Sequence, residues 1–363
     1  MTTPLSITIT VVREENSARH MSSINLKIQQ DNFKIVNNNV LIKYLGDGSV
    51  VVIPDGIKEI SHFAFQNEQC ANITEVVIPS SVEEVNCPFS HCSGLEKITV
   101  DAKNPNYQTI DGHLYTKDGS VLVAYAPASK EDRFIIPEGV TNIEAFAFSN
   151  CSLEELVIPA SVDKIENAAL SRGIKHLCID EGNTSYYENN GLLLTKDNKT
   201  VLRYFGNAST VEIPLGVTHI ASGAFAECNC LEAIALSSSI IEIAEHSFYN
   251  CKKLQRLSLP TSLKSIRRNA FEGCSSLTEI EIPQGITELD GKMFGGCTSL
   301  ASITIPDSVT NIDVFVFKDC TNLASITFEG SIAQWNAISF GEWWNDDFST
   351  TEVICSDGVV KLN

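Results

Sequence analysis

The 363-residue sequence lacks several features that would place it in a particular class of protein. It has no run of about 18 apolar residues, which argues against a membrane-spanning helix. Basic residues are few: 26 lysines and arginines stand against 45 aspartates and glutamates, for a formal net charge of −19. Because nucleic-acid binding depends largely on cationic contacts to phosphate, this balance argues against a nucleic-acid partner. The charge predicts a well-solvated surface, or one that meets a basic partner.

Catalytic and metal-binding motifs are also missing. The sequence contains no H-E-x-x-H, G-x-S-x-G, Walker or G-x-G-x-x-G pattern. Cys228 and Cys230 form the one close cysteine pair, and no second pair completes the ligand set of a structural zinc site. Cys87 and His91 lie four residues apart, but they fall in a repeated segment. We predict no catalytic residues, no cofactor-binding residues and no metal ligands. A hydrolase site assembled from distant segments is the remote alternative.

The N-terminal segment does not have the organisation of a secretory signal. Its apolar run, Leu5 to Val12, is interrupted by threonines and has no basic residue before it. His20-Met21 indicates either a cloning junction or a second start. We therefore predict that residues 1–20 are a flexible or cloning-derived extension and that residues 21–50 form an N-terminal cap. On the sequence alone, the expected location is cytoplasmic.

A repeat of 23 residues dominates the remaining sequence. The pattern apolar-x-apolar-Pro occurs at 51–54, 76–79, 134–137, 156–159, 211–214, 257–260, 280–283 and 303–306, and without its proline at 234–237. From Pro214 through Ser237, Pro260 and Pro283 to Pro306, each step is 23 residues. The full unit can be written L-x-x-I-x-I-P-x-S/G-V-x-x-I-x-x-x-A-F-x-x-C-x-x.

Each part of this unit has a physical interpretation. I-x-I predicts a strand, which the proline ends because proline has no N–H for the ladder. V-x-x-I predicts the next inward-facing pair, and A-F predicts an interior plug, as in Ala270-Phe271. One unit cannot bury its own apolar face, but stacked units can. With further strands at 98–100, 177–179 and 326–328, we predict about twelve strands, which would make a stack about 55–60 Å long if all of them share one parallel sheet.

The repeat resembles the BspA-type leucine-rich repeats over about residues 51–329, and IPDSVTNIDVFVFKDCTNL at 305–323 is its clearest copy. The resemblance implies an α/β-type repeat solenoid. In detail, it implies a leucine-rich repeat, right-handed stack of short parallel strands with β-hairpin inserts. Gly285 stands where the usual leucine-rich repeat has its asparagine, so a tightly curved horseshoe is not predicted.

Two long spacings contain inserts, at 101–133 and 180–210, that match each other at an offset of 79 residues. Turn dipeptides between strand-like runs predict β-hairpins that project from the solenoid, and 37–54 looks like a partial third copy. The inserts are either edge decoration or ligand-contacting loops, since inserts in repeat arrays often mark the binding face. The candidate contact residues are Tyr107, His113, Tyr115, Tyr186, Tyr187 and Arg203.

Cysteine and tryptophan occupy special places in the repeat array. Seven of the twelve cysteines recur at one repeat position, which predicts a column of buried, reduced thiols that suits a reducing compartment or an anaerobic source. All three tryptophans fall in residues 330–363, where the period fails. We predict that this segment is a C-terminal cap. An exposed aromatic platform is the alternative.

The resemblance also implies a function. BspA-type proteins are associated with adhesion at microbial surfaces, so we expect a non-enzymatic, adhesin-like protein that binds a host or cell-surface protein. That function implies a cell-surface or secreted location. An intracellular interaction scaffold with the same fold is the alternative. Neither cofactor nor nucleic acid nor membrane insertion is expected, and nothing in the sequence names the partner.

Overall fold

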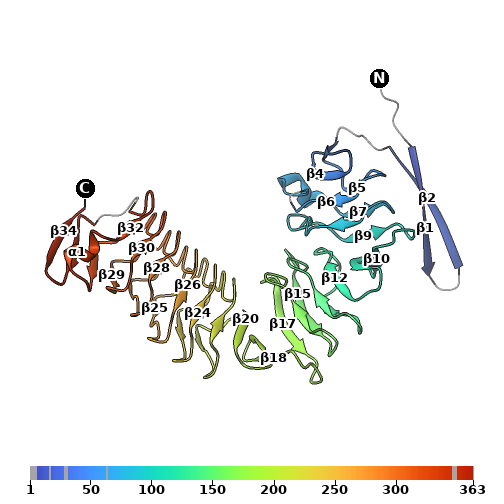
Figure 1. Ribbon diagram of the computed structural model, residues 1–363. Helices are drawn as coiled ribbons and strands as arrows, with labels where there is room; N and C mark the ends of the chain where they lie inside the picture. The colour runs from blue at the N-terminus through green and yellow to red at the C-terminus, as the bar shows by residue number, and fades with distance from the viewer. Residues whose placement is uncertain (1–5, 16–17, 28–31, 63, 346–349, 363) are drawn as a thin grey trace. The chain divides into compact units, whose positions relative to one another are not determined.

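The computed structural model describes residues 6–15, 18–27, 32–62, 64–345 and 350–362. These residues fall into two compact units, Met1–Lys175 and His176–Asn363. Each unit is a stack of coils, one coil per repeat, built almost wholly from short strands (Figure 1). The helices of the described residues are short: α1 (Ile332–Trp335) and a 3-10 helix at Glu68–Asn72. The α/β label is therefore not confirmed, and the fold is a β-solenoid.

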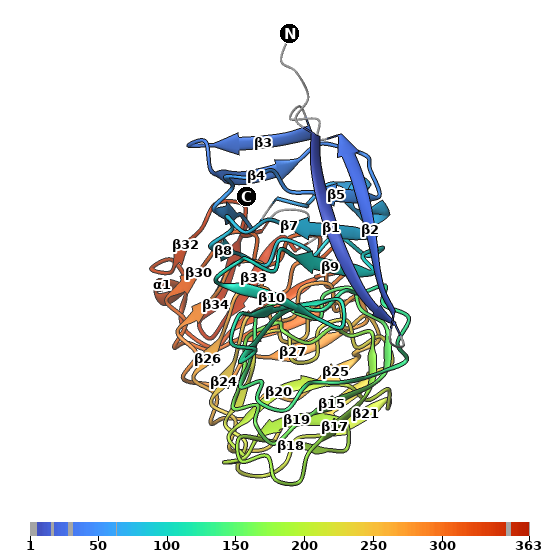
Figure 2. The ribbon, with the colours of Figure 1, turned by 90° about the vertical axis from the view of Figure 1, so that its right-hand side faces the viewer.

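Every predicted I-x-I segment forms a strand. In the first unit these strands are β5 (Val50–Val52), β7 (Glu75–Ile78), β9 (Lys97–Val100), β13 (Arg133–Ile135) and β15 (Leu153–Ile158), with β17 (Ile174–Ile179) at the division between the units. In the second unit they are β21 (Thr210–Glu212), β23 (Ala233–Ala235), β25 (Arg256–Leu257), β27 (Glu279–Glu281), β29 (Ser302–Ile305) and β31 (Ser325–Phe328). Neighbours pair in parallel, as β5, β7 and β9 do in Figures 1 and 2.

The strands do not share one parallel sheet, because each coil contributes to two ladders: the I-x-I strands form the first ladder, and the V-x-x-I strands form the second. The V-x-x-I segment forms a second, two-residue strand that pairs in parallel with its counterparts on neighbouring coils. These strands are β6 (Glu59–Ile60), β8 (Glu84–Val85), β14 (Asn142–Ile143), β16 (Lys164–Ile165), β22 (His219–Ile220), β24 (Glu242–Ile243), β26 (Ser265–Ile266), β28 (Glu288–Leu289), β30 (Asn311–Ile312) and β32 (Ser339–Phe340). Both ladders are also divided into separate blocks.

A column of phenylalanines fills the interior of the second unit. The rings of Phe225, Phe248, Phe271, Phe294 and Phe317 stack nearly parallel, with successive centroids 5.2, 5.4, 5.6 and 5.9 Å apart. All five side chains are fully buried. This arrangement confirms that the A-F pair is the interior plug, and it follows from stacking identical positions one coil apart.

The repeat cysteines form a second buried column beside these rings. Four of these thiols donate to the main-chain oxygen of the phenylalanine 26 residues earlier: those of Cys251 and Cys274, that of Cys297 to Phe271 at 3.3 Å, and that of Cys320 to Phe294 at 3.1 Å. Burial raises the pKa of the Cys320 thiol to about 12. These side chains pack in the interior of the coils, where a buried, protonated thiol is a poor nucleophile.

The two inserts are three-stranded antiparallel sheets whose last strand joins the second ladder. Contrary to the prediction, they do not project freely, because β12 pairs in parallel with β14 and β20 with β22. The first consists of β10 (Tyr107–Ile110), β11 (His113–Thr116) and β12 (Val121–Ala124), and the second of β18 (Tyr186–Asn189), β19 (Leu192–Thr195) and β20 (Thr200–Tyr204). The predicted third copy behaves alike: β3 (Phe33–Val36) pairs with β4 (Val40–Tyr44), and β4 with β6.

A tyrosine at the end of each of these segments begins an aromatic column. Tyr44 lies 5.6 Å from Phe65, and Tyr204 lies 5.5 Å from Phe225, between ring centroids. The phenolic oxygen in each case accepts a hydrogen bond at 3.2 Å from a backbone N–H four residues later. Tyr125 occupies the same place against Phe148. The tyrosine therefore replaces a phenylalanine where the column begins.

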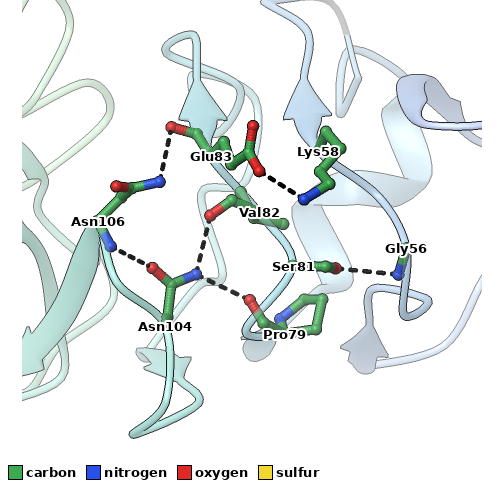
Figure 3. Close-up of polar contacts among 8 residues, drawn as sticks. All are labelled: Gly56, Lys58, Pro79, Ser81, Val82, Glu83, Asn104 and Asn106. Carbon is green, nitrogen blue, oxygen red and sulfur yellow. Dashed lines mark hydrogen bonds and ion pairs between the residues drawn. The ribbon is translucent and has the colours of Figure 1, made fainter.

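A buried asparagine anchors the start of each insert. In the first unit, the side-chain amide of Asn104 donates to the carbonyl oxygens of Pro79 (2.9 Å) and Val82 (3.0 Å) on the preceding coil (Figure 3). Its oxygen accepts from the N–H groups of Asn106 (2.8 Å) and Tyr107 (2.9 Å). All four hydrogen-bonding positions of the amide are thus used, which ties the insert to the coil before it.

The chain ends show two further features. β1 (Ser6–Glu15) and β2 (Ala18–Lys27) form an antiparallel hairpin whose pairing crosses the expected boundary at residue 20. At the other end, β33 (Glu352–Cys355) extends the first ladder and β34 (Gly358–Lys361) pairs with it in antiparallel. Trp335 is buried against Phe328, whereas Trp343 stacks on Phe315 and keeps 57% of its surface exposed. Over the described residues, no helix has the length and apolarity needed to span a membrane.

Candidate binding groove in the second insert

The candidate contact residues of the first insert lie mostly inside the fold. His113 and Tyr115 on β11 have no exposed surface. Tyr107 on β10 is half-buried, and its phenolic oxygen accepts from the N–H of Val85 at 3.1 Å. From these positions His113 and Tyr115 cannot touch a ligand, because the strands that carry them are part of the stack and do not project.

In the second insert the candidates divide in the same way. Tyr186 is 7% exposed. Arg203 on β20 is half-buried, and its guanidinium donates to the carbonyl oxygen of Gly223 at 2.8 Å, which ties it to the next coil. Tyr187 is half-buried, and its hydroxyl donates to Asn198 Oδ1 at 2.6 Å. Of the six candidates, Tyr186 and Tyr187 border a pocket.

His113 is a buried, neutral side chain. Its Nδ1 accepts from the N–H of Ala126 at 3.0 Å, so the ring proton lies on Nε2. Nε2 lies 3.8 Å from Glu131 Oε2, beyond hydrogen-bond distance, and neither atom has a hydrogen-bond partner among the described residues. Burial lowers the pKa of His113 to about 4. Burial also raises the pKa of Glu131, with a smaller contribution from Asp111. The charged forms of both side chains are therefore disfavoured here.

We expect the first unit to lose stability in mild acid through His113. Because the folded pKa, about 4, lies below the unfolded value of about 6.5, the unfolded chain binds the proton first, and stability falls as the pH drops from about 6.5 to 4. His113→Asn keeps an acceptor for Ala126 but does not titrate. Urea unfolding followed by circular dichroism at several pH values gives the slope of the unfolding free energy against pH, and hence the proton uptake on unfolding. We expect this uptake to be smaller by about one proton in the variant. Equal slopes against pH would contradict the assignment.

A pocket of about 350 Å³ lies between the end of β17 and the start of β18, wholly within the second unit. Tyr186, buried, and Tyr187, half-buried, line it on β18. Leu177 and Ile179 of β17 provide apolar contacts, and the exposed thiol of Cys178 stands between them. The remaining lining residues are Asp180, Glu181, Glu188 and Lys196. We call this pocket the acidic groove.

In the first insert, a threonine links β9 and β10, the two strands that correspond to β17 and β18. Thr109 Oγ1 accepts from the N–H of Val100 at 2.8 Å and donates to the carbonyl oxygen of Ile98 at 3.0 Å, so β10 is held against β9. The residue 79 positions later is Glu188. Its Oε1 instead accepts from the N–H of Gly191 at 2.5 Å. An ionised carboxylate cannot donate to a carbonyl oxygen, so Glu188 cannot reproduce the link that Thr109 makes.

The groove carries more negative than positive charge. Asp180 Oδ1 accepts from the N–H of Gly182 at 2.8 Å, which holds this carboxylate in the turn after β17. Glu181 is exposed and makes no hydrogen bond or ion pair with any described residue. The ammonium of Lys196 likewise forms no ion pair within the described part of the chain. The groove therefore contains three carboxylates and one ammonium, and the ammonium forms no ion pair with any of the three.

Glu181 and Glu188, two of the three carboxylates of the groove, were not among the sequence candidates, whereas Tyr187 was. Glu181, Tyr187 and Glu188 stand where the first insert has Ala102, Gln108 and Thr109. The differences between the two aligned inserts therefore indicate both glutamates. In the part of the chain that the structure describes, no cluster of His, Cys, Asp and Glu could hold a metal ion.

Comparison with known proteins gives one family. The family model of the BspA type leucine rich repeat region matches residues 21–121, 123–190 and 198–324, in six copies. No curated protein sequence matches the chain significantly.

Several solved structures are similar. One is a leucine-rich repeat protein from Eubacterium ventriosum (21% identity, 86% of this chain and 89% of that chain covered, TM-score 0.55). Another is a leucine rich cell surface protein from Faecalibacterium prausnitzii (23% identity, 93% and 98% covered, TM-score 0.55). A third is the pneumococcal vaccine antigen PcpA (20% identity, 91% and 98% covered, TM-score 0.55). At these identities the likeness shows the fold alone.

Proposed function

Because the chain belongs to the BspA-type leucine-rich repeat family, we propose that it is a non-catalytic recognition protein that binds a protein partner at a bacterial cell surface, as an adhesin does. Neighbouring strands in its ladders present their outward side chains in register. On β27 and β29, for example, Glu279 lies opposite Ser302 and Glu281 opposite Thr304, while Ile280 faces the core. Repeated over many strands, this makes a broad polar face of the kind that protein interfaces need.

The similar solved structures support the proposed location. One of them is a leucine rich cell surface protein and another is a vaccine antigen. The charge of −19 favours a partner with a basic surface, since complementary charge steers association.

An intracellular interaction scaffold is the second candidate, and one observation favours it. None of the twelve cysteines, all of which lie in the described part of the chain, is in a disulfide bond, and most of them are buried in the repeat column. Free thiols in such number are usual in reducing compartments and unusual in oxidising ones.

The location of the native protein distinguishes the two candidates. We expect antibodies against the full chain to label intact source cells, and brief protease treatment of those cells to remove the label. An antibody against a cytoplasmic protein of the same cells serves as the control for leakage. Labelling that requires lysis would contradict the surface role and favour the scaffold.

A further inference from the structure

The acidic groove has the chemistry of a receptor for one basic side chain. Asp180, Glu181 and Glu188 provide carboxylates, and Lys196 is the one cation that lines it. Glu181 has no partner among the described residues, and one oxygen of Glu188 is engaged by Gly191. An incoming cation therefore has no strong ion pair to displace, which favours binding.

The size and the walls of the groove favour a guanidinium group. A volume of about 350 Å³ is at the small end of ligand sites, enough for a side chain and too small for a folded element. Tyr187 provides an aromatic wall whose hydroxyl is fixed by Asn198. Arginine stacks on aromatic rings and forms paired hydrogen bonds with carboxylates, whereas the lysine ammonium is a compact, strongly hydrated charge.

The first insert shows that the opening depends on a few residues. There the bonds from Thr109 to Val100 and Ile98 hold the strands together, and Ile98 also donates to the carbonyl oxygen of Gly112 at 2.7 Å. Ala102 and Gln108, which correspond to Glu181 and Tyr187, have neither a carboxylate nor an aromatic ring. The first insert thus keeps one carboxylate, Asp101, at the place where the second has three, and provides an internal control for the acidic groove.

We propose that the acidic groove binds an arginine side chain of the partner protein, with Glu181 and Glu188 contacting the guanidinium and the ring of Tyr187 stacking on it. This inference rests on the proposed function, since it names the chemistry by which a protein partner is recognised. It makes the second insert, and not the first, the specific contact.

The test uses the full chain and a fluorescein-labelled Gly-Arg-Gly-Arg-Gly peptide, with binding followed by anisotropy. Matched peptides contain lysine or uncharged citrulline in place of arginine. We expect saturable binding of the arginine peptide, weaker binding of the lysine peptide and none of the citrulline peptide. Binding of all three alike, tighter binding of lysine, or no saturable binding of arginine would each overturn the proposal.

Three variants locate the site on the chain. E181A/Y187Q/E188T gives the second insert the residues of the first, and should weaken arginine-peptide binding by about tenfold or more. E181A alone changes an exposed side chain without partners, so it tests the site even if the triple variant does not fold. E245A/E342A removes two exposed charges of the second unit that do not line the groove, and should change affinity by less than about twofold.

An equal loss of binding in E245A/E342A would show that general acidity, and not the groove, attracts the peptide, and would overturn the proposal. The result is independent of the location test. A protein found inside the cell contradicts the adhesin role while leaving arginine binding intact. If the protein lies at the surface but the triple variant binds the peptide as well as the wild type does, the proposal for the groove is contradicted and the adhesin role is not.

Discussion

Phe271→Ala is expected to lower the free energy of unfolding of the second unit by about 3–5 kcal/mol. Phe271 has no exposed surface, and its ring stacks between Phe248 at 5.4 Å and Phe294 at 5.6 Å. Truncation removes buried apolar surface and leaves a cavity inside a column that cannot close, because each ring is carried by its own coil. Urea unfolding followed by tryptophan fluorescence measures the effect, since all three tryptophans lie in this unit.

A matched control for this variant is Leu215→Ala in the same unit. Leu215 is also a large apolar residue, but 76% of its surface is exposed. Its truncation should cost less than about 0.5 kcal/mol. A loss below about 1 kcal/mol for Phe271→Ala would contradict the role of the phenylalanine as the interior plug.

Asn104→Ala should destabilise the first unit by about 3–5 kcal/mol. The substitution leaves four backbone groups without their partner: the carbonyls of Pro79 and Val82 and the N–H group of Asn106, which Figure 3 shows, and the N–H group of Tyr107. Asn104 is 1% exposed, so water cannot readily replace the amide. Urea unfolding followed by far-ultraviolet circular dichroism measures the loss, because the first unit has no tryptophan.

Asn106→Ala is the control for this second variant. Asn106 lies two residues away, but its amide makes one long hydrogen bond, 3.4 Å to the carbonyl oxygen of Glu83, near solvent. We expect a cost below about 1 kcal/mol. Equal losses for the two asparagines would show that the anchor is not the source of stability at this turn.

The sequence was sufficient to predict the repeating core. The 23-residue period, the prolines, Ala-Phe and the cysteine recur because stacking places identical positions in contact, and such a pattern is visible without coordinates. The second ladder was missed because strands such as β24 and β30 have two residues each, too few for any alternation to show. The expected helical character likewise came from the family resemblance and not from periodicity.

The candidate contact residues show where such inference ended. Tyrosine, histidine and arginine in a turn-rich insert are typical of a ligand-contacting loop, and nothing local distinguishes His113 from Tyr187. Their exposure depends on pairing with strands about 20 residues away, β12 with β14 and β20 with β22. Those parallel pairs place β11 and β19 inside the stack, with Leu114 and Leu193 fully buried.

The amino-acid sequence was therefore enough to establish the family, the coil and what fills it, because each coil repeats the same local solution and packs on a copy of itself. The positions of the inserts and the groove required the folded chain. In one insert Thr109 can donate a hydrogen bond to Ile98, and in the other Glu188 turns to Gly191. Thr109 is thus a hydrogen-bond donor, whereas Glu188 is a charged acceptor. This difference affects binding because Glu188 lines the acidic groove, where β17 and β18 face each other.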